Sequence, residues 1–324
     1  MRWKRSSANR TVLFCLLAAL LGPREGVADY AYVTNQSSSD LSVIDLERMT
    51  EIRRIPVPGM PAGVAVSEAL GAFFTVSPDS KTIRRFGLAD ALPQIELQLD
   101  GGPIGIAIDD SRRRIFVSDW YNARVWVLLA DDLSLMATLE TGSAPAGLAI
   151  SPDGRWLATA DRDSNQISIF DADTLSLLHR ITVGERPFGL TFSPDGRVFS
   201  ADVGSNTVTA VDPESGRVLG RVRTGERPYG IAFATERGFV TNQYGDSVTV
   251  FDARTYAQVA VIDVGGYPEG IDTTADGQHI AVANWDSNTL SIIDAKNLEV
   301  VGEIATGDGP RAFGLFLAKD MQKE

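Results

Sequence analysis

The chain is poor in the side chains that most often carry out chemistry in proteins. Its 324 residues include one cysteine, Cys15, and two histidines, His179 and His279. This scarcity excludes a disulfide framework, a CxxCH haem attachment and a Cys/His zinc site of the usual ligand number. The histidines lie 100 residues apart in unlike settings, His179 within an apolar run and His279 beside the turn Asp276-Gly277, so a histidine-based acid–base or nucleophile pair is not expected.

Long apolar runs are also scarce, and the one that stands out lies near the N-terminus. Four basic residues precede a run of twelve mainly apolar residues, 11–22, and the small residues Gly26 and Ala28 follow it. This order is typical of a cleavable secretory signal peptide over 1–28. Twelve residues are too few to span a bilayer, which needs about 20; a retained signal anchor is the alternative.

Cleavage after Ala28 would change the charge of the chain. It removes five basic residues and one acidic residue, which leaves 41 acidic and 25 basic side chains and a net charge of −16. Such a charge repels nucleic acids and anionic lipid at long range. We therefore expect a periplasmic protein that binds no nucleic acid and, having no second long apolar segment, inserts into no membrane.

Glycine and proline are ordinary in number but regular in position. A Pro-x-Gly followed by alternating apolar residues recurs every 40 to 44 residues, and the last copy is a longer variant. The seven copies are Pro61–Gly63, Pro103–Gly105, Pro145–Gly147, Pro187–Gly189, Pro228–Gly230, Pro268–Gly270 and Pro310–Gly314. Repeats of this period indicate a solenoid, an array or a propeller.

Each repeat contains four short runs with the period-2 alternation of β-strands. In the fourth repeat these are 147–151, 156–160, 166–171 and 176–183. Four antiparallel strands in about 40 residues are typical of a propeller blade. The sequence thus predicts an all-β, seven-bladed β-propeller over 29–318, with a tail over 319–324. An open array or a sandwich is less favoured, because closure buries both faces of every blade.

The two chain ends indicate how the ring closes. The predicted mature chain begins with the second strand of a blade, at Tyr30–Asn35, and ends with an unpaired first strand, Ala312–Leu317. We therefore expect the C-terminal strand to lie innermost in the first blade, with Phe313, Leu315 or Leu317 buried. One closed ring also favours a monomer.

The repeats carry a family resemblance. Tyr32-Val-Thr-Asn35 followed by Leu41-Ser-Val-Ile-Asp45 resembles the YVTN-type propeller repeat of exported bacterial proteins, and close copies are Val240–Asn242 with Val248–Asp252 and Val282–Asn284 with Leu290–Asp294. The resemblance covers residues 30–317 and implies a seven-bladed propeller. Relatives include proteins associated with PQQ-dependent quinoprotein oxidation. Fold alone does not assign an activity.

Two sets of loops should lie on one face of the propeller: the loops that enter the first strands and the loops between the second and third strands. The candidate binding residues lie in or next to these loops. The residue before each repeat glycine is expected to line this channel mouth, and the seven copies differ. The candidates, including neighbouring arginines and aromatics of the second loops, are Trp120, Tyr121, Arg186, Phe188, Arg227, Tyr229, Tyr244, Glu269, Trp285, Arg311 and Phe313. Tryptophan and tyrosine beside arginine are common anchors of interfaces.

Asparagine or aspartate ends six of the seven second strands. Such residues usually order loop backbone. Asp119, Asp161 and Asp202 are nevertheless candidates for a Ca²⁺ site, because Ca²⁺ binds carboxylate and amide oxygens. No other cofactor is expected.

Three functions follow as hypotheses. The favoured one is a non-enzymatic periplasmic binding protein or scaffold that takes a protein or small molecule at the channel mouth, and the resemblance places its partner in a quinoprotein or cytochrome system. The second is a Ca²⁺-assisted hydrolase such as a lactonase, with Glu269 as the base. The third is the propeller subunit of a complex resembling amine dehydrogenase.

Overall fold

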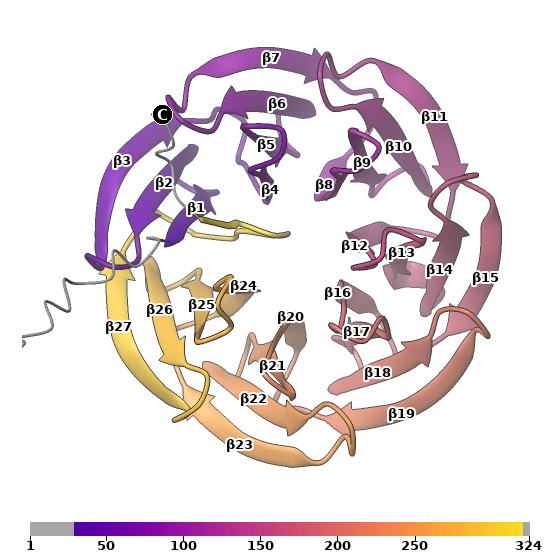
Figure 1. Ribbon diagram of the computed structural model, residues 1–324, viewed down its shortest axis with the longest axis vertical. Helices are drawn as coiled ribbons and strands as arrows, with labels where there is room; N and C mark the ends of the chain where they lie inside the picture. Colours follow the sequence, from indigo (N-terminus) through magenta and orange to yellow (C-terminus); the bar gives the residue numbers. More distant parts are fainter. Residues whose placement is uncertain (1–28, 320–324) are drawn as a thin grey trace, which may run out of the picture.

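The computed structural model describes residues 29–319, so the predicted signal peptide over 1–28 and residues 320–324 lie outside the described part. Within it, 28 strands form seven four-stranded sheets in a ring, as Figure 1 shows. Every strand pairing inside these sheets is antiparallel. The predicted seven-bladed propeller is confirmed.

The strands follow one another around the ring from the first blade to the last. The closing sheet has the order β28-β1-β2-β3, and the other six sheets use four consecutive strands each. The strands are β1 (Asp29–Asn35), β2 (Asp40–Asp45), β3 (Thr50–Pro56), β4 (Gly63–Ser67), β5 (Ala72–Ser77), β6 (Thr82–Gly87), β7 (Pro93–Gln98), β8 (Pro103–Asp109), β9 (Arg114–Asp119), β10 (Arg124–Leu129), β11 (Leu135–Glu140), β12 (Pro145–Ile150), β13 (Trp156–Asp161), β14 (Gln166–Asp171), β15 (Leu177–Thr182), β16 (Pro187–Phe192), β17 (Val198–Asp202), β18 (Thr207–Asp212), β19 (Arg217–Arg223), β20 (Pro228–Ala234), β21 (Arg237–Asn242), β22 (Ser247–Asp252), β23 (Gln258–Asp263), β24 (Pro268–Thr273), β25 (His279–Asn284), β26 (Thr289–Asp294), β27 (Glu299–Ala305) and β28 (Leu317–Lys319).

Burial within a blade follows the residue pattern of each strand. The second strands are apolar on both sides, as in Ala72–Ser77, and all six of these residues are buried. The outermost strands alternate, so that only Leu139 of Leu135–Glu140 is buried. Both faces of a middle strand pack on neighbouring blades, whereas an outer strand faces solvent. The core is therefore divided into clusters between blades rather than gathered in one centre.

The repeat glycines bring the innermost strands of adjacent blades into contact. A methyl group built on Gly105 would lie 2.2 Å from the Ala146 carbonyl oxygen of the next blade, and one on Gly189 would lie 2.0 Å from the Tyr229 carbonyl oxygen. The corresponding distance at Gly314, in the last repeat, is 2.3 Å to the Val64 carbonyl oxygen. Glycine thus recurs because the backbone of the next blade occupies the space of a side chain.

Gly189→Ala is expected to destabilise the protein by about 1–3 kcal/mol, since the added methyl would overlap a backbone oxygen that cannot rotate away. The measurement is the midpoint of urea unfolding. Gly266→Ala is the matched control, because its methyl would meet side-chain atoms alone, the rotatable Ser287 hydroxyl at 3.3 Å and the Asp286 side chain at 3.5 Å. Equal midpoints for the two variants would contradict the role assigned to the repeat glycines.

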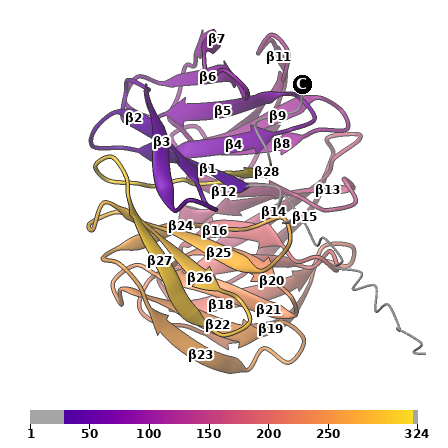
Figure 2. The ribbon, with the colours of Figure 1, turned by 60° about the vertical axis from the view of Figure 1, so that its left-hand side comes forward.

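The C-terminal segment closes the ring beside the first blade, as predicted (Figures 1 and 2). Its strand β28 pairs with β1 from Asp29 to Ala31. Upstream of β28, the Arg311 N–H donates to the Thr34 carbonyl at 2.8 Å, and the Tyr32 N–H donates to the Phe316 carbonyl at 2.9 Å. Main-chain hydrogen bonds therefore join the two ends of the described chain.

The predicted bounds and the predicted buried residue of this segment were wrong. The innermost strand is Leu317–Lys319 rather than Ala312–Leu317. Phe316 is the fully buried aromatic; of the three residues predicted, Phe313 and Leu317 are partly buried and Leu315 is 64% exposed. The last repeat has two more residues between its proline and its glycine than the others, and Gly314 has a φ of +119°. These features break the regular ladder at the glycine.

Helix is almost absent from the described residues. They contain one three-residue 3-10 helix, η1 (Arg162–Ser164), in the loop after β13. None of their helices has the length and apolar character required to cross a bilayer.

Candidate functional site

The loops that enter the first strands and the loops that follow the second strands do share one face of the ring. The Trp120 N–H donates to the Gly102 carbonyl at 2.9 Å, and the Gln243 N–H donates to the Arg227 carbonyl at 3.0 Å. The backbone N–H of Trp285 makes the same contact with the Tyr267 carbonyl, at 3.0 Å. We call this side the mouth face. The repetition of one contact in successive blades brings side chains from distant repeats around one opening.

Three aromatic rings meet at the channel axis below the mouth face. The Phe188 and Tyr229 rings stack with their centroids 4.2 Å apart, and the Phe313 ring lies 5.2 and 5.4 Å from them. We call Phe188, Tyr229 and Phe313 the aromatic plug. Trp120 packs on it, 6.1 Å from Phe188, and the Arg162 guanidinium lies 5.4 Å from the Trp120 ring. The sequence predicted these four aromatics, and the fold unites them in one cluster.

A buried polar network borders the plug. Glu269 is completely buried, and its Oε1 accepts a hydrogen bond from Gln243 Nε2 at 2.7 Å. Its Oε2 lies 3.5 Å from Arg311 Nη1, and Arg311 Nε donates to Gln36 Oε1 at 2.8 Å. The network therefore joins three blades and includes the C-terminal segment.

Burial makes the carboxyl group of Glu269 hard to ionise. Loss of solvation raises its pKa to about 7, although Arg311, Gln243 and Arg227 act in the opposite direction. Burial also raises the pKa of the Tyr229 hydroxyl; the charge of Glu269 raises it further, while Arg311 lowers it. Near neutral pH the mouth can thus exchange a proton at Glu269 while Tyr229 stays neutral.

A second aromatic group lies beside this network. The Tyr267 ring lies 5.5 Å from Tyr244 and 5.6 Å from Trp285. Arg227 stacks over Tyr244 with 4.3 Å to the ring centre, and its Nη1 donates to the Tyr244 hydroxyl at 2.8 Å. Tyr244 is half exposed, which is how the aromatic anchors of interfaces are usually placed.

Several buried polar atoms of this region have no hydrogen-bond partner among the described residues. They are Glu269 Oε2, Gln243 Oε1, Trp285 Nε1 and Arg227 Nε. Buried polar groups in proteins are nearly always paired, so such a concentration is unusual. Together these atoms offer two acceptors and two donors.

The other predicted binding residues lie farther from the network. Tyr121 is 71% exposed, and its ring lies against Gly102, where an added methyl would be 2.5 Å from the ring. Arg186 is exposed on the mouth face, where its N–H donates to Asn165 Oδ1. These two side chains border the mouth without joining the buried cluster.

The three candidate metal ligands are occupied within their own blades. Asp119 accepts from the Gly102 N–H, Asn122 and Arg124, and Asp161 accepts from Gln166 and Ser168. Asp202 accepts from Ser200, Thr207 and Thr209, and burial raises its pKa to about 6. No trio of His, Cys, Asp or Glu side chains suited to a metal ion occurs among residues 29–319. This geometry favours the loop-ordering interpretation; Ca²⁺ binding stays a prediction.

The sequence interpretation missed four members of the site. Gln36, Arg162 and Gln243 occupy the position directly after the end of a second strand, which Trp120 and Trp285 also occupy. Tyr267 directly precedes a repeat proline, as Arg186 and Arg227 do. Comparison of these two positions across the repeats is a signal that could have found all four.

Family models match this architecture. The model of the YNCE-like beta-propeller matches residues 133–321, which is more than half of the chain, and the NHL repeat model matches residues 101–128. No curated protein matches the chain significantly.

Solved structures share the fold at low sequence identity. Kuenenia stuttgartiensis hydrazine synthase superposes with a TM-score of 0.71 at 18% identity, covering 79% of this chain and 89% of that chain. A functionally unknown protein from Desulfotomaculum acetoxidans DSM 771 superposes with a TM-score of 0.76 at 16% identity, covering 90% of this chain and 98% of that chain. Dihydro-heme d1 dehydrogenase NirN in complex with DHE superposes with a TM-score of 0.68 at 15% identity, covering 90% of this chain and 75% of that chain. Likeness at these identities shows the fold alone.

Proposed function

Since the chain belongs to the YNCE-like β-propeller family, we propose that it is a binding propeller of the periplasm with no chemistry of its own. It takes a protein or small-molecule partner at the mouth face. The partner belongs to a periplasmic redox system, such as a quinoprotein dehydrogenase or its cytochrome.

The observation that carries this proposal is a set of buried polar atoms at the mouth that make no hydrogen bond to the described residues, of which Glu269 Oε2 has only the ion pair with Arg311, at 3.5 Å. Glu269 Oε2, Gln243 Oε1, Trp285 Nε1 and Arg227 Nε lack hydrogen-bond partners within the described structure. An unpaired buried polar group costs about 1–3 kcal/mol, so a ligand that supplies matching donors and acceptors would recover this free energy on binding. Tyr244 adds exposed aromatic surface beside these atoms, and Tyr121 adds exposed aromatic surface farther along the border of the mouth.

Two further features support a partner from a redox system and a location in the periplasm. The YVTN-type repeats resemble those of propellers associated with quinoprotein oxidation, and two proteins of similar fold are named hydrazine synthase and dihydro-heme d1 dehydrogenase. The basic and apolar segment within 1–28 supports export. The net charge of −16 after cleavage argues against a nucleic-acid partner.

Removing three mouth aromatics should weaken capture of the partner. We expect immobilised protein to retain a defined partner from periplasmic extract, and Trp120→Ala/Tyr244→Ala/Trp285→Ala to retain at least tenfold less, because a tryptophan or tyrosine that is a hot spot of an interface contributes about 2 kcal/mol or more. Quantitative mass spectrometry of the eluate and its visible haem absorption are the measurements.

A control variant separates a specific site from general stickiness. Leu135→Ala/Met136→Ala/Val261→Ala removes three apolar side chains that are 50–58% exposed on outer strands. Undiminished capture by the mouth variant, or an equal loss in the control, would reject the site. Metal analysis of the same sample tests the hydrolase alternative, which requires stoichiometric Ca²⁺. A retained cofactor-bearing small subunit would instead support the resemblance to amine dehydrogenase.

A further inference from the structure

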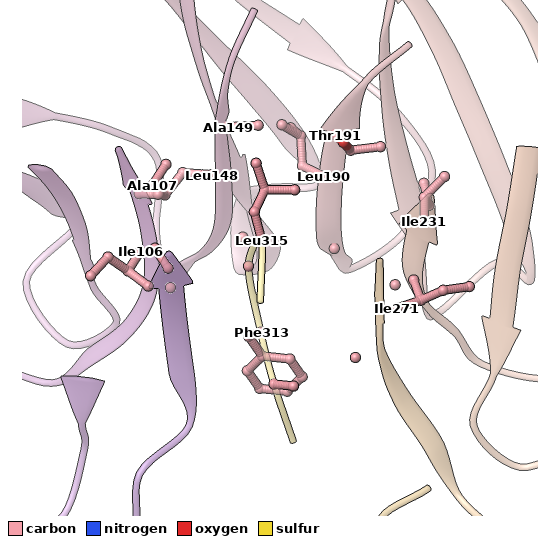
Figure 3. A pocket seen from close by; sticks show the side chains of 18 of the residues that line it. Ile106, Ala107, Leu148, Ala149, Leu190, Thr191, Ile231, Ile271, Phe313 and Leu315 are labelled. Carbon is pink, nitrogen blue, oxygen red and sulfur yellow. The ribbon is translucent and has the colours of Figure 1, made fainter. Parts of the chain in front are cut away.

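An apolar chamber lies on the axis of the ring and meets the polar network of the mouth only at Glu269. Its volume is about 340 Å³, and the innermost strands of the blades and the C-terminal segment line it. Figure 3 shows Phe313 at one end, Leu315 near the middle, and Ala149 and Thr191 toward the other end. Binding pockets for small molecules are mostly apolar and begin at about 300 Å³, so the chamber has the size and the surface of a ligand site.

The chamber opens away from the mouth face. The aromatic plug of Phe188, Tyr229 and Phe313 forms its floor on the mouth side. Its opposite end is lined by Asp110 and Pro152, which lie in the loops between the first and second strands of their blades. A molecule in the chamber would therefore enter from the face opposite to the proposed partner site.

Leu315 behaves differently from its counterparts in the other repeats. The residue directly after the repeat glycine is at most 9% exposed in the six other copies, whereas Leu315 is 64% exposed. Those counterparts are Val64, Ile106, Leu148, Leu190, Ile231 and Ile271. Because the C-terminal segment leaves the regular ladder at Gly314, Leu315 presents its side chain to the chamber instead of a blade interface. Covering this apolar surface would favour an apolar ligand.

We propose that the chamber binds an uncharged, hydrocarbon-rich small molecule with about a dozen non-hydrogen atoms, of the kind represented by a medium-length alkyl chain. The size follows because an engineered cavity of about 150 Å³ holds one benzene, and this chamber has roughly twice that volume. The charge follows because the ionisable lining residues are Asp110, at the rim, and Glu269, which is held by Gln243 and Arg311. The carboxylate of Asp110 would repel an anionic ligand, and the apolar remainder of the lining would strip the hydration from a charge of either sign.

The test uses 1-decanol as the ligand and 1-naphthylamine, which matches it in size, as an uncharged fluorescent reporter. We expect saturable reporter binding with one site per chain and displacement of the reporter by decanol. Leu315→Glu should weaken binding of both at least tenfold, because it places a charge against the hydrocarbon. Thr191→Glu, on the inner strand of another blade, should do the same without altering the ring closure.

Leu135→Glu is the matched control, because Leu135 is 58% exposed on an outer strand, and it should bind as the unchanged protein does. Far-ultraviolet circular dichroism confirms that each variant is folded. Absence of saturable binding, or equal affinity in Thr191→Glu and Leu135→Glu, would overturn the proposal. Tyr244→Ala/Trp285→Ala, which leaves Trp120 in place on the plug, should lose partner capture and still bind decanol, because neither residue lines the chamber. The two proposals can therefore fail independently.

Discussion

A chain that stops at Pro310 is expected to lose its single sharp unfolding transition and to melt broadly at a much lower temperature. The truncation removes the N–H of Arg311 and the carbonyl groups of Phe313, Leu315 and Phe316, which bond β1 and β4. It also removes the fully buried Phe316 ring. Differential scanning calorimetry is the measurement. A sharp transition at an unchanged temperature would contradict closure by the C-terminal segment.

Two single substitutions in this segment separate loss of closure from loss of chain length. Phe316→Ala should destabilise the protein by about 3–5 kcal/mol, as truncation of a buried phenylalanine does, because the ring is completely buried. Its neighbour Leu315 is 64% exposed, so Leu315→Ala should cost well under 1 kcal/mol. Similar losses in urea unfolding would show that burial in this segment was misassigned.

The protein is expected to be more stable at pH 5 than at pH 8, with a difference in Tm on the order of 10 °C. Burial raises the pKa of Asp272 and of Glu269 to about 7 each, and that of Asp202 to about 6. The folded state therefore binds more protons than the unfolded state between roughly pH 4 and pH 7. Stability then falls as the pH rises through this range, by about 1.4 kcal/mol per pH unit and group.

The environment of Asp272 gives the sharpest test of this dependence. Its Oδ2 accepts the N–H groups of Phe316 and Leu317, at 2.8 and 3.0 Å. Asp29 lies near enough to raise the pKa of Asp272 further. Asp272→Asn keeps an oxygen acceptor and removes the charge, so the decline in Tm between pH 5 and pH 8 should become shallower.

Asp131→Asn provides the control for the pH experiment. Asp131 is exposed, and its ion pair with Arg113 lowers its pKa, so this carboxyl group is ionised in both states throughout the range tested. In this control variant Tm should decline between pH 5 and pH 8 as steeply as in the unchanged protein. A decline that is equally steep in Asp272→Asn and Asp131→Asn would show that Asp272 is not its source.

The repeat itself made the blade count predictable, because each glycine reports a close backbone contact that every blade must make. The strands predicted for the fourth repeat agree with β12 to β15 to within two residues. The closing segment was harder to predict. Its two additional residues before Gly314 are visible in the sequence, but the resulting turn of Leu315 toward the axis depends on contacts with β1 and β4.

The candidate site was also predictable only in part. Comparing equivalent positions identified Phe188, Tyr229, Glu269 and Phe313 as neighbours at the mouth, because repeats with the same backbone fold place equivalent residues in one ring. The comparison did not show that Glu269 is completely buried, or that it binds Gln243 and approaches Arg311. Whether a side chain is buried depends on the size of the side chains in the adjacent blades. The spacing of residues within one repeat contains no information on those sizes.

The sequence alone determined the β-propeller, its seven blades and the face on which its variable residues gather, because each follows from local periodicity repeated along the chain. The tertiary structure decided the aromatic plug, the unpaired polar atoms and the apolar chamber. These features arise where side chains from blades far apart in the sequence meet at the axis. Whether such side chains pack, pair or leave a space depends on their volumes and directions in three dimensions.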